Sequence, residues 1–349
     1  MIQTLSYYWE VFKQGYTSYA NYLWYEITHP GWHNYFYWLI GVSLFFFALE
    51  IFTPWRKNQA KFRKDFWLDL FYMFFNFFLF SLIIYNAASD VIVRFFNNII
   101  IGISGFDLQA VNPLRTWPLW AVLIVGFIVR DFVQWNVHRL LHSNRKLWEF
   151  HKVHHSVEEM GFAAHLRYHW METIVYRSIE YMPLALLGIG LYDFFIIHIA
   201  TLAIGHYNHS NITVKPRTSG AILGAFIGFL MYFGFADITV MEGMSTVVKL
   251  LIWAGVIGVG YFIVGPYMKI IFNSPEMHIW HHSYDLPEDH QDGINFGISL
   301  AIWDYLFGSA VIPHTGRDIR LGFPDIEKFP KHFWDQATYG FRSNKKAGS

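Results

Sequence analysis

The sequence predicts an all-α integral membrane protein built as a multi-span helical bundle. Three observations support this: an apolar composition, several apolar runs long enough to cross a membrane, and histidine clusters at the ends of those runs. Of the 349 residues, 54% are hydrophobic and only 15% are charged. Soluble domains average roughly 25% charged residues. The composition therefore favours one membrane-embedded body over two soluble domains.

Net charge and cysteine content exclude several classes of protein. The chain is neutral at pH 7, so nothing indicates a nucleic-acid partner. It contains no cysteine, which excludes disulfides, thiolate metal sites, iron–sulfur clusters and cysteine nucleophiles. Any metal must therefore be held by imidazole, carboxylate or water.

The N-terminal segment, residues 1–33, lacks the basic start and clean apolar run of a signal peptide. Its many tyrosines and tryptophans are typical of a helix that lies at the membrane interface. A polar, aromatic lead-in without such a role is the alternative interpretation.

Apolar runs predict the membrane-embedded domain, residues 34–311, because a spanning helix needs roughly 20 apolar residues. The predicted spans are residues 34–55, 66–85 and 117–137, a hairpin over 172–206 broken at "GIG" (188–190), and an inserted pair at about 219–271, with apolar stretches at 219–236 and 247–271. The polar tail, residues 312–349, is predicted to cover the cytoplasmic side.

The distribution of basic residues predicts the orientation. The loop between the first two spans holds Arg56, Lys57, Lys61, Arg63 and Lys64, whereas residues 86–116 hold only two arginines. The positive-inside rule places the first loop in the cytoplasm. Spans two and three then go out and back, and each later hairpin leaves and returns on one side. The histidine clusters between residues 138 and 282 are therefore expected on the cytoplasmic face, unless either hairpin is a single span.

Histidines recur at helical spacing in this region. "HRLLH" places two of them at i and i+4 on one helix face, and "HKVHH" and "HIWHH" each give i, i+3 and i+4. The histidines in these motifs, with those of "HLRYHWME" and "HYNHSN", are His138, His142, His151, His154, His155, His165, His169, His206, His209, His278, His281 and His282. Isolated histidines elsewhere, His29, His33, His290, His314 and His332, are interpreted as surface or hydrogen-bonded core residues.

The number of imidazoles indicates two metal ions. The three motifs and His209 supply nine, more than one transition metal can use. We therefore expect a histidine-rich di-metal cap on the cytoplasmic face. The nearby acids Asp131, Glu149, Glu158 and Asp304 are candidate hydrogen-bond partners of ring N–H groups; an ordinary surface or capping role is the alternative. Imidazole suits iron as well as zinc, and two redox metals in a membrane can oxidise lipid hydrocarbon with O2.

The chain resembles the fatty acid hydroxylase/sterol desaturase superfamily of membrane di-iron proteins. The resemblance rests on "LEIFTPWR" (49–56), "DFVQWNVHRLLHSNRKLWEFHKVHHSVEEM" (131–160), "HSN" (209–211), "SPEMHIWHHS" (274–283) and "DGINFGISLAIWDYLFGS" (292–309). It implies an O2-dependent enzyme with two iron ions, placed in a bacterial inner membrane or the endoplasmic reticulum. Such an enzyme hydroxylates or desaturates a sterol, fatty acyl chain or ether lipid. Its electrons come from a reductase, cytochrome b5 or a ferredoxin.

The resemblance also implies roles for single residues. The implied metal ligands are His138, His142, His151, His154, His155, His209, His278, His281 and His282, with His169 and His206 at positions where the family varies. Asn295 and Asp304 occupy the closing motif, where structural or second-layer roles are implied, and Asp131 is expected in the same layer. The insert at 219–271 departs from the family pattern. It either reshapes the lipid entry path or serves as scaffold or dimer contact.

Three other classes fit parts of the pattern. A metal transporter would need histidines or polar residues in the middle of several spans, and only His198 lies within one. A bis-histidine haem carrier would need pairs on facing helices inside the membrane. The intact ligand set argues against the third class, a non-catalytic metal-binding membrane protein.

Overall fold

The computed structural model describes residues 5–31, 34–76, 78–80, 86–105, 107, 114, 116–187, 189 and 191–347. These residues form helices and loops, with isolated bridges but no β-strand in the part described. Some predicted features lie outside the described residues: the end of the second predicted span (81–85), His33, Arg115, and the two glycines of the predicted "GIG" break. The all-helical prediction is confirmed.

Among the described residues, three helices are long and apolar enough to cross a membrane. They cover Tyr35–Phe52, Leu119–Ser143 and Thr246–Ile271 and coincide with three of the predicted spans. The remaining apolar segments also form helices: α3 (Phe66–Phe74), α7 (Trp170–Leu187), α8 (Leu191–His209) and α9 (Pro216–Phe233). That these four helices cross the membrane remains a prediction. The three long helices fit a membrane protein.

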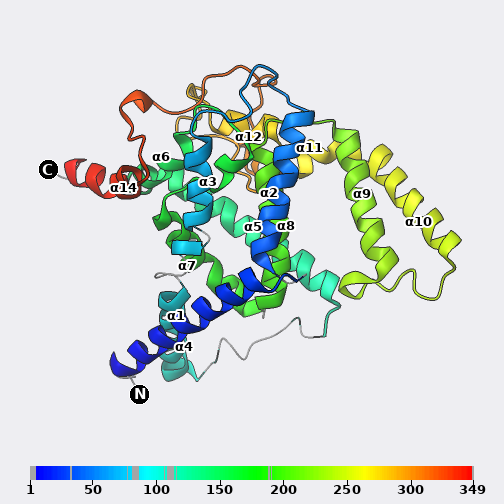
Figure 1. Cartoon of the computed structure of the whole chain (residues 1–349), viewed down its shortest axis with the longest axis horizontal. Coiled ribbons are helices and arrows are strands. Elements are labelled where there is room, and N and C mark those ends of the chain that lie inside the picture. Colours follow the sequence, from blue (N-terminus) through cyan, green and yellow to red (C-terminus); the bar gives the residue numbers. More distant parts are fainter. Residues whose placement is uncertain are drawn as a thin grey trace.

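The bundle is organised around α5 (Leu119–Ser143), which packs against α7 and α8. Helix α2 (Tyr35–Phe52) covers α8, and the short α12 (Pro275–His281) contacts the far end of α8. As Figure 1 shows, α12 and α6 (Arg145–His155) lie toward one end of the bundle and α1 (Leu5–Thr28) toward the other. The histidine motifs are therefore gathered at one end; that this end is cytoplasmic remains a prediction.

The opposite end contains a helix that the sequence analysis did not predict. Helix α4 (Asn86–Ser104) packs against α1, and together they close this end of the bundle (Figure 1). The two-helix packing gives the N-terminal segment a structural partner. Its location at the membrane interface remains a prediction.

The predicted insert forms a hairpin of α9 and α10 (Thr246–Val259) that stands to the side of the bundle (Figure 1). The two helices approach closely because α9 has glycine at every fourth position of its contact face. A Cβ atom on Gly220 would lie 2.1 Å from the carbonyl oxygen of Gly260. Small residues at this spacing let two membrane helices pack backbone to backbone.

The C-terminal segment packs beside the histidine end of the bundle. Helix α14 (Phe333–Ala347) contacts α6, and its Phe333 and Ala337 are buried with Tyr72 and Val153. The Tyr72 hydroxyl donates a hydrogen bond to Gln336 Oε1 at 2.9 Å. The predicted polar tail thus forms part of the folded body next to the histidines.

Candidate metal centre

Nine buried or nearly buried histidines converge in two groups at the α12 end of the bundle. Within each group, one ring nitrogen from every member lies within 4.8 Å of the others. One group contains His138, His142, His151, His155 and His281, and the other contains His154, His209, His278 and His282. These are the nine residues that the sequence singled out, drawn from α5, α6, α8 and α12.

Local helix geometry explains how each motif divides between the groups. Asn144 caps α6 by accepting hydrogen bonds from the backbone of Lys146 and Leu147, and Ser274 caps α12 in the same way. Helix α6 therefore begins six residues before its H-x-x-H-H motif and α12 three residues before its own, and each motif lies at the C-terminal end of its helix. In each motif the i and i+4 rings join one group and the i+3 ring joins the other.

Backbone carbonyls and one carboxylate fix the orientation of the rings. In four histidines Nδ1 donates a hydrogen bond to a backbone carbonyl, which can only accept, and in His151 Nδ1 donates to the Glu172 carboxylate, so Nε2 carries the lone pair. The pairs are His138 with Phe296 O (2.8 Å), His154 with Arg167 O (3.0 Å), His209 with Gly205 O (2.8 Å), His281 with Ile294 O (2.7 Å) and His151 with Glu172 Oε2 (2.8 Å).

The Nε2 lone pairs of these histidines are placed where they could bind metal ions. Nε2 of His138 lies 3.2 Å from Nε2 of His151, and Nε2 of His154 lies 3.3 Å from Nε2 of His209. Since the Nδ1 atoms of all four rings are already donating, each pair brings two lone pairs together without a proton between them. Such an arrangement is repulsive unless a cation lies among the nitrogens. There is one such pair in each group, so each group has the donor set for one metal ion.

Burial keeps these rings neutral. It lowers the pKa of His151 and His154 to about 3 and the pKa of His155, His281 and His282 well below its usual value. An imidazole must be unprotonated to bind a metal. At neutral pH the rings therefore offer lone pairs without first losing a proton.

The predicted acids Asp131 and Asp304 lie one step further from the rings than expected. Asp131 accepts hydrogen bonds from the backbone of Ser299 and Leu300, and Asp304 from the backbone of Phe296 and Gly297. Among the described contacts, neither carboxylate is hydrogen-bonded to a histidine ring. They hold the loop whose carbonyls orient the rings.

Asn295 lies in this loop in a left-handed conformation, with φ of 55°. Its side chain donates to Met277 O and to Val311 O and accepts from the backbone of Val311. Its neighbours Ile294 and Phe296 supply the carbonyls to His281 and His138. The other two predicted acids, Glu149 and Glu158, form ion pairs with Lys152 and Lys64.

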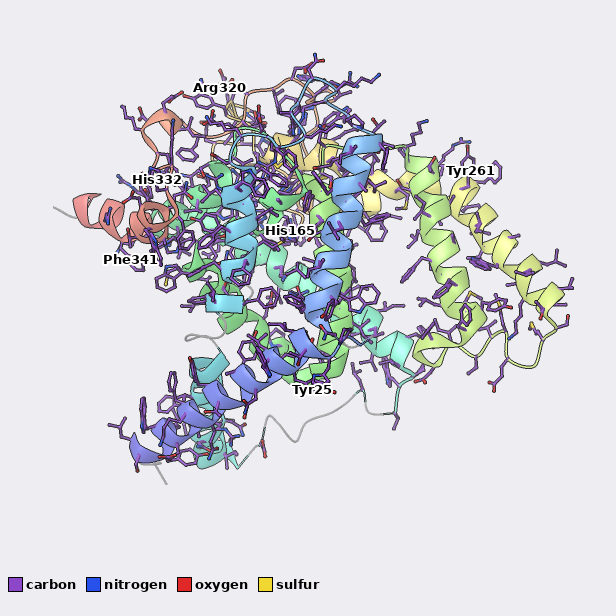
Figure 2. The ribbon with its side chains drawn as sticks, in the orientation of Figure 1. Tyr25, His165, Tyr261, Arg320, His332 and Phe341 are labelled. Carbon is purple, nitrogen blue, oxygen red and sulfur yellow. The ribbon has the colours of Figure 1, made fainter. Side chains whose placement is uncertain are left out.

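His169 and His206 stand outside both groups. His169 Nε2 donates to the carbonyl of Ala337 on α14, at 2.8 Å. His206 is hydrogen-bonded to Ser43 at 3.0 Å and to the ring of His165 at 2.9 Å. Figure 2 shows His165 in the interior of the bundle. These contacts give both residues roles in packing around the centre.

Sequence reasoning missed Glu172, the carboxylate that contacts His151. It follows His169 by three residues, and its Oε1 also accepts from the backbone N–H of His169 at 3.1 Å. Glu172 is 4% exposed, so this contact is shielded from water. No signal in the sequence separates it from the other acids near the motifs.

Glu172→Gln is expected to weaken metal binding in the five-histidine group by about 10- to 100-fold, as removal of such supporting partners does elsewhere. The amide keeps the shape but loses the negative charge that stabilises the metal-bound imidazole of His151. A titration with a competing chelator measures the change, and Glu149→Gln serves as the matched control. Equal metal retention in the two variants would contradict this role for Glu172.

A cavity of about 960 Å³ opens onto the centre and is large enough for a lipid-sized ligand. It reaches His138, His151, His154, His209 and His278 at one end and residues of α1, including Val11 and Leu23, at the other. The centre is thus buried but faces a large internal space.

An all-helical structure with spanning-length helices and two buried histidine groups fits the class of histidine-rich membrane proteins that could bind metal. The sequence profile of the fatty acid hydroxylase family matches residues 123–227 and 218–309, which together cover more than half of the chain. The chain belongs to the fatty acid hydroxylase family.

One relative is the ornithine lipid hydroxylase OlsE of Rhizobium tropici. It is 27% identical over 225 residues, which cover 64% of this chain and 52% of the relative. The chain thus matches about half the length of this relative. No solved structure shows a significant match.

Proposed function

We propose that the chain is an O2-dependent di-iron oxygenase that hydroxylates a membrane lipid. The observation that carries the proposal is the pair of buried imidazole groups facing one lipid-sized cavity. Membership of the hydroxylase family and the resemblance to a lipid hydroxylase support the reaction type. Desaturation, the other outcome expected from the sequence, has no such support.

Within this proposal the nine grouped histidines would hold two iron ions, one at the five-histidine group and one at the four-histidine group. Bound iron would supply the redox chemistry by which O2 oxidises an unactivated C–H bond. One C–H bond, O2, a pair of electrons and a pair of protons give the alcohol and water. The electrons come from a reductase, a ferredoxin or cytochrome b5.

The protein's own residues bind and orient. The carbonyls of Phe296, Ile294 and Arg167 hold the rings in the tautomer that binds metal. Burial of the groups excludes bulk water, and the cavity admits the substrate to the side on which His138 and His154 line it. This exclusion favours oxidation of the bound lipid over unproductive consumption of O2.

We place the centre on the cytoplasmic face of a multi-pass protein. The basic loop at residues 56–64 lies at the same end as the histidines: Arg56 Nη2 donates to Met160 O at 3.0 Å, and Lys64 Nζ contacts Glu158 at 2.6 Å. If this loop is cytoplasmic by the positive-inside rule, the centre is too.

Lipid profiling of cells with and without the gene, grown under ¹⁸O2, tests the proposal. One lipid species should gain a labelled oxygen only when the gene is present. The purified protein should contain about two irons per chain and no haem absorbance. Absence of a labelled lipid, or zinc in place of iron, would contradict the proposal. Haem absorbance would indicate an electron carrier instead.

A further inference from the structure

Polar and charged residues line the cavity beyond the metal centre. Helix α5 presents Arg130, Gln134 and His138 to the cavity at positions i, i+4 and i+8, on one face. With a rise of about 1.5 Å per residue, Gln134 lies about 6 Å and Arg130 about 12 Å from His138 along the helix axis. A charge at this depth of a spanning-length helix is costly and is by default a mark of function.

Helix α7 contributes a matching stripe. Glu172, Tyr176 and Glu180 line the cavity at the same i, i+4, i+8 spacing, so Glu180 lies two turns below the residue that contacts His151. Gln134 Nε2 donates to Glu180 Oε1 at 2.6 Å, and Arg130 Nε lies 3.7 Å from Glu180 Oε2. The cation and the anion thus sit side by side on one wall.

Helix α8 holds the arginine in place. Arg130 Nη1 donates to Thr201 Oγ1 at 2.6 Å, and Nη2 lies 3.3 Å from His198 Nδ1. Arg130 is 3% exposed and Glu180 2%, so water does not screen the pair. The guanidinium is fixed against the cavity rather than free to leave it.

Other polar atoms on this wall have hydrogen-bonding capacity to spare. Within the described residues, Gln134 Oε1, Asn208 Oδ1 and Thr173 Oγ1 are buried and lack a hydrogen-bond partner. All three residues line the cavity. Unsatisfied buried polar atoms are rare in folded proteins, so three of them in residues that line one cavity favour a polar ligand.

The cavity wall also offers apolar surface. Leu23, Phe36, Phe78 and Leu202 line it and pack together, although Glu26 and Arg94 also line the cavity near α1 and α4. The cavity therefore combines polar and apolar surface. An amphiphilic ligand matches this combination.

We infer that the wall of Arg130, Gln134 and Glu180 binds the head group of a zwitterionic lipid inside the bundle, so that the oxidised carbon lies in or beside that head group. The inference rests on the proposed function. Arg130 complements an acid group and Glu180 an amine, and both lie within about two helical turns of His138. A hydrocarbon chain at the same place would put no polar group against this charged wall.

The test expresses the full chain in a bacterial host under ¹⁸O2 and supplies three lipids as probes. Ornithine lipid carries an amine and a carboxylate, phosphatidylethanolamine an amine and a phosphate, and phosphatidylglycerol a phosphate alone. Fragmentation mass spectrometry separates label in the head-group fragment from label in the acyl fragment. We expect label in or next to the head group of one amine-bearing lipid, and which of the two it is identifies the acid group.

Glu180→Gln and Gln134→Leu are expected to reduce labelled product about 10-fold or more, since each removes polar contacts to the head group. Iron content of the purified variants should stay at the wild-type level, because neither residue lies in a histidine group. Glu242→Gln, an exposed glutamate between α9 and α10, is the matched control and should not change turnover. Label deep in an acyl chain, or full turnover in Glu180→Gln, would overturn the inference and leave the proposed function standing.

A binding measurement separates the two claims further. Native mass spectrometry of the purified protein should retain a zwitterionic lipid more strongly than phosphatidylglycerol, and Glu180→Gln should lose this preference. Retention without any labelled product would refute the oxygenase function but not the head-group site. Equal retention of all three lipids would refute the head-group site.

Discussion

His154→Ala is expected to remove the metal of the four-histidine group and to abolish turnover. His154 supplies a lone pair 3.3 Å from that of His209, and its own Nδ1 is fixed by the carbonyl of Arg167. Alanine leaves three imidazoles in a group that has four. Because the proposed reaction needs both metals, loss of one is expected to stop it. The iron content of the purified variant, measured by metal analysis, should fall from about two irons per chain to about one or fewer.

His314→Ala is the matched control for this substitution. His314 is exposed and belongs to neither group. Its backbone carbonyl accepts a hydrogen bond from Trp280 Nε1 at 2.8 Å, and alanine keeps that carbonyl. Iron content and labelled lipid should match the wild type. Turnover in His154→Ala, measured beside this control, would show that the ligand assignment is wrong.

The sequence predicts the convergence of the histidines well because the spacing of their motifs is a property of single helices. Rings four residues apart on α5 must share a face, and the structure brings the ends of α5, α8 and α12 together. Helix α4 was not predicted, since "NAASDVIVRFFNNIIIGIS" mixes polar and apolar residues without a run of spanning length. Its stability as a helix depends on packing against α1, which no local pattern reveals.

The sequence could not predict how the nine histidine rings divide into groups of five and four. It depends on how α6 and α12 face each other, a relation between segments more than 100 residues apart. The partners of the ring N–H groups were equally hidden, because four of the five described are backbone carbonyls that any residue type supplies. Attention to carboxylates therefore led to Asp131 and Asp304, which act on the loop, and missed Glu172.

Asp304→Ala is expected to destabilise the protein and to reduce metal binding at the five-histidine group. Asp304 is fully buried and accepts hydrogen bonds from the backbone of Phe296 and Gly297, from Trp135 Nε1 and from the Ser309 hydroxyl. Alanine leaves these donors buried and unsatisfied, at about 1–3 kcal/mol each. We therefore expect the free energy of unfolding to fall by about 3 kcal/mol or more, which denaturant unfolding in detergent measures.

The loss of metal follows from the same loop. Phe296 is held by Asp304 through its N–H and orients His138 through its carbonyl, so the carboxylate acts on the imidazole across one residue. Iron content of Asp304→Ala should therefore drop even in protein that remains folded, whereas Asp289→Ala, an exposed acid beside His290, should leave both iron and stability unchanged. If Asp304→Ala lost stability but kept its full iron, the rings would be oriented by the metal rather than by the loop.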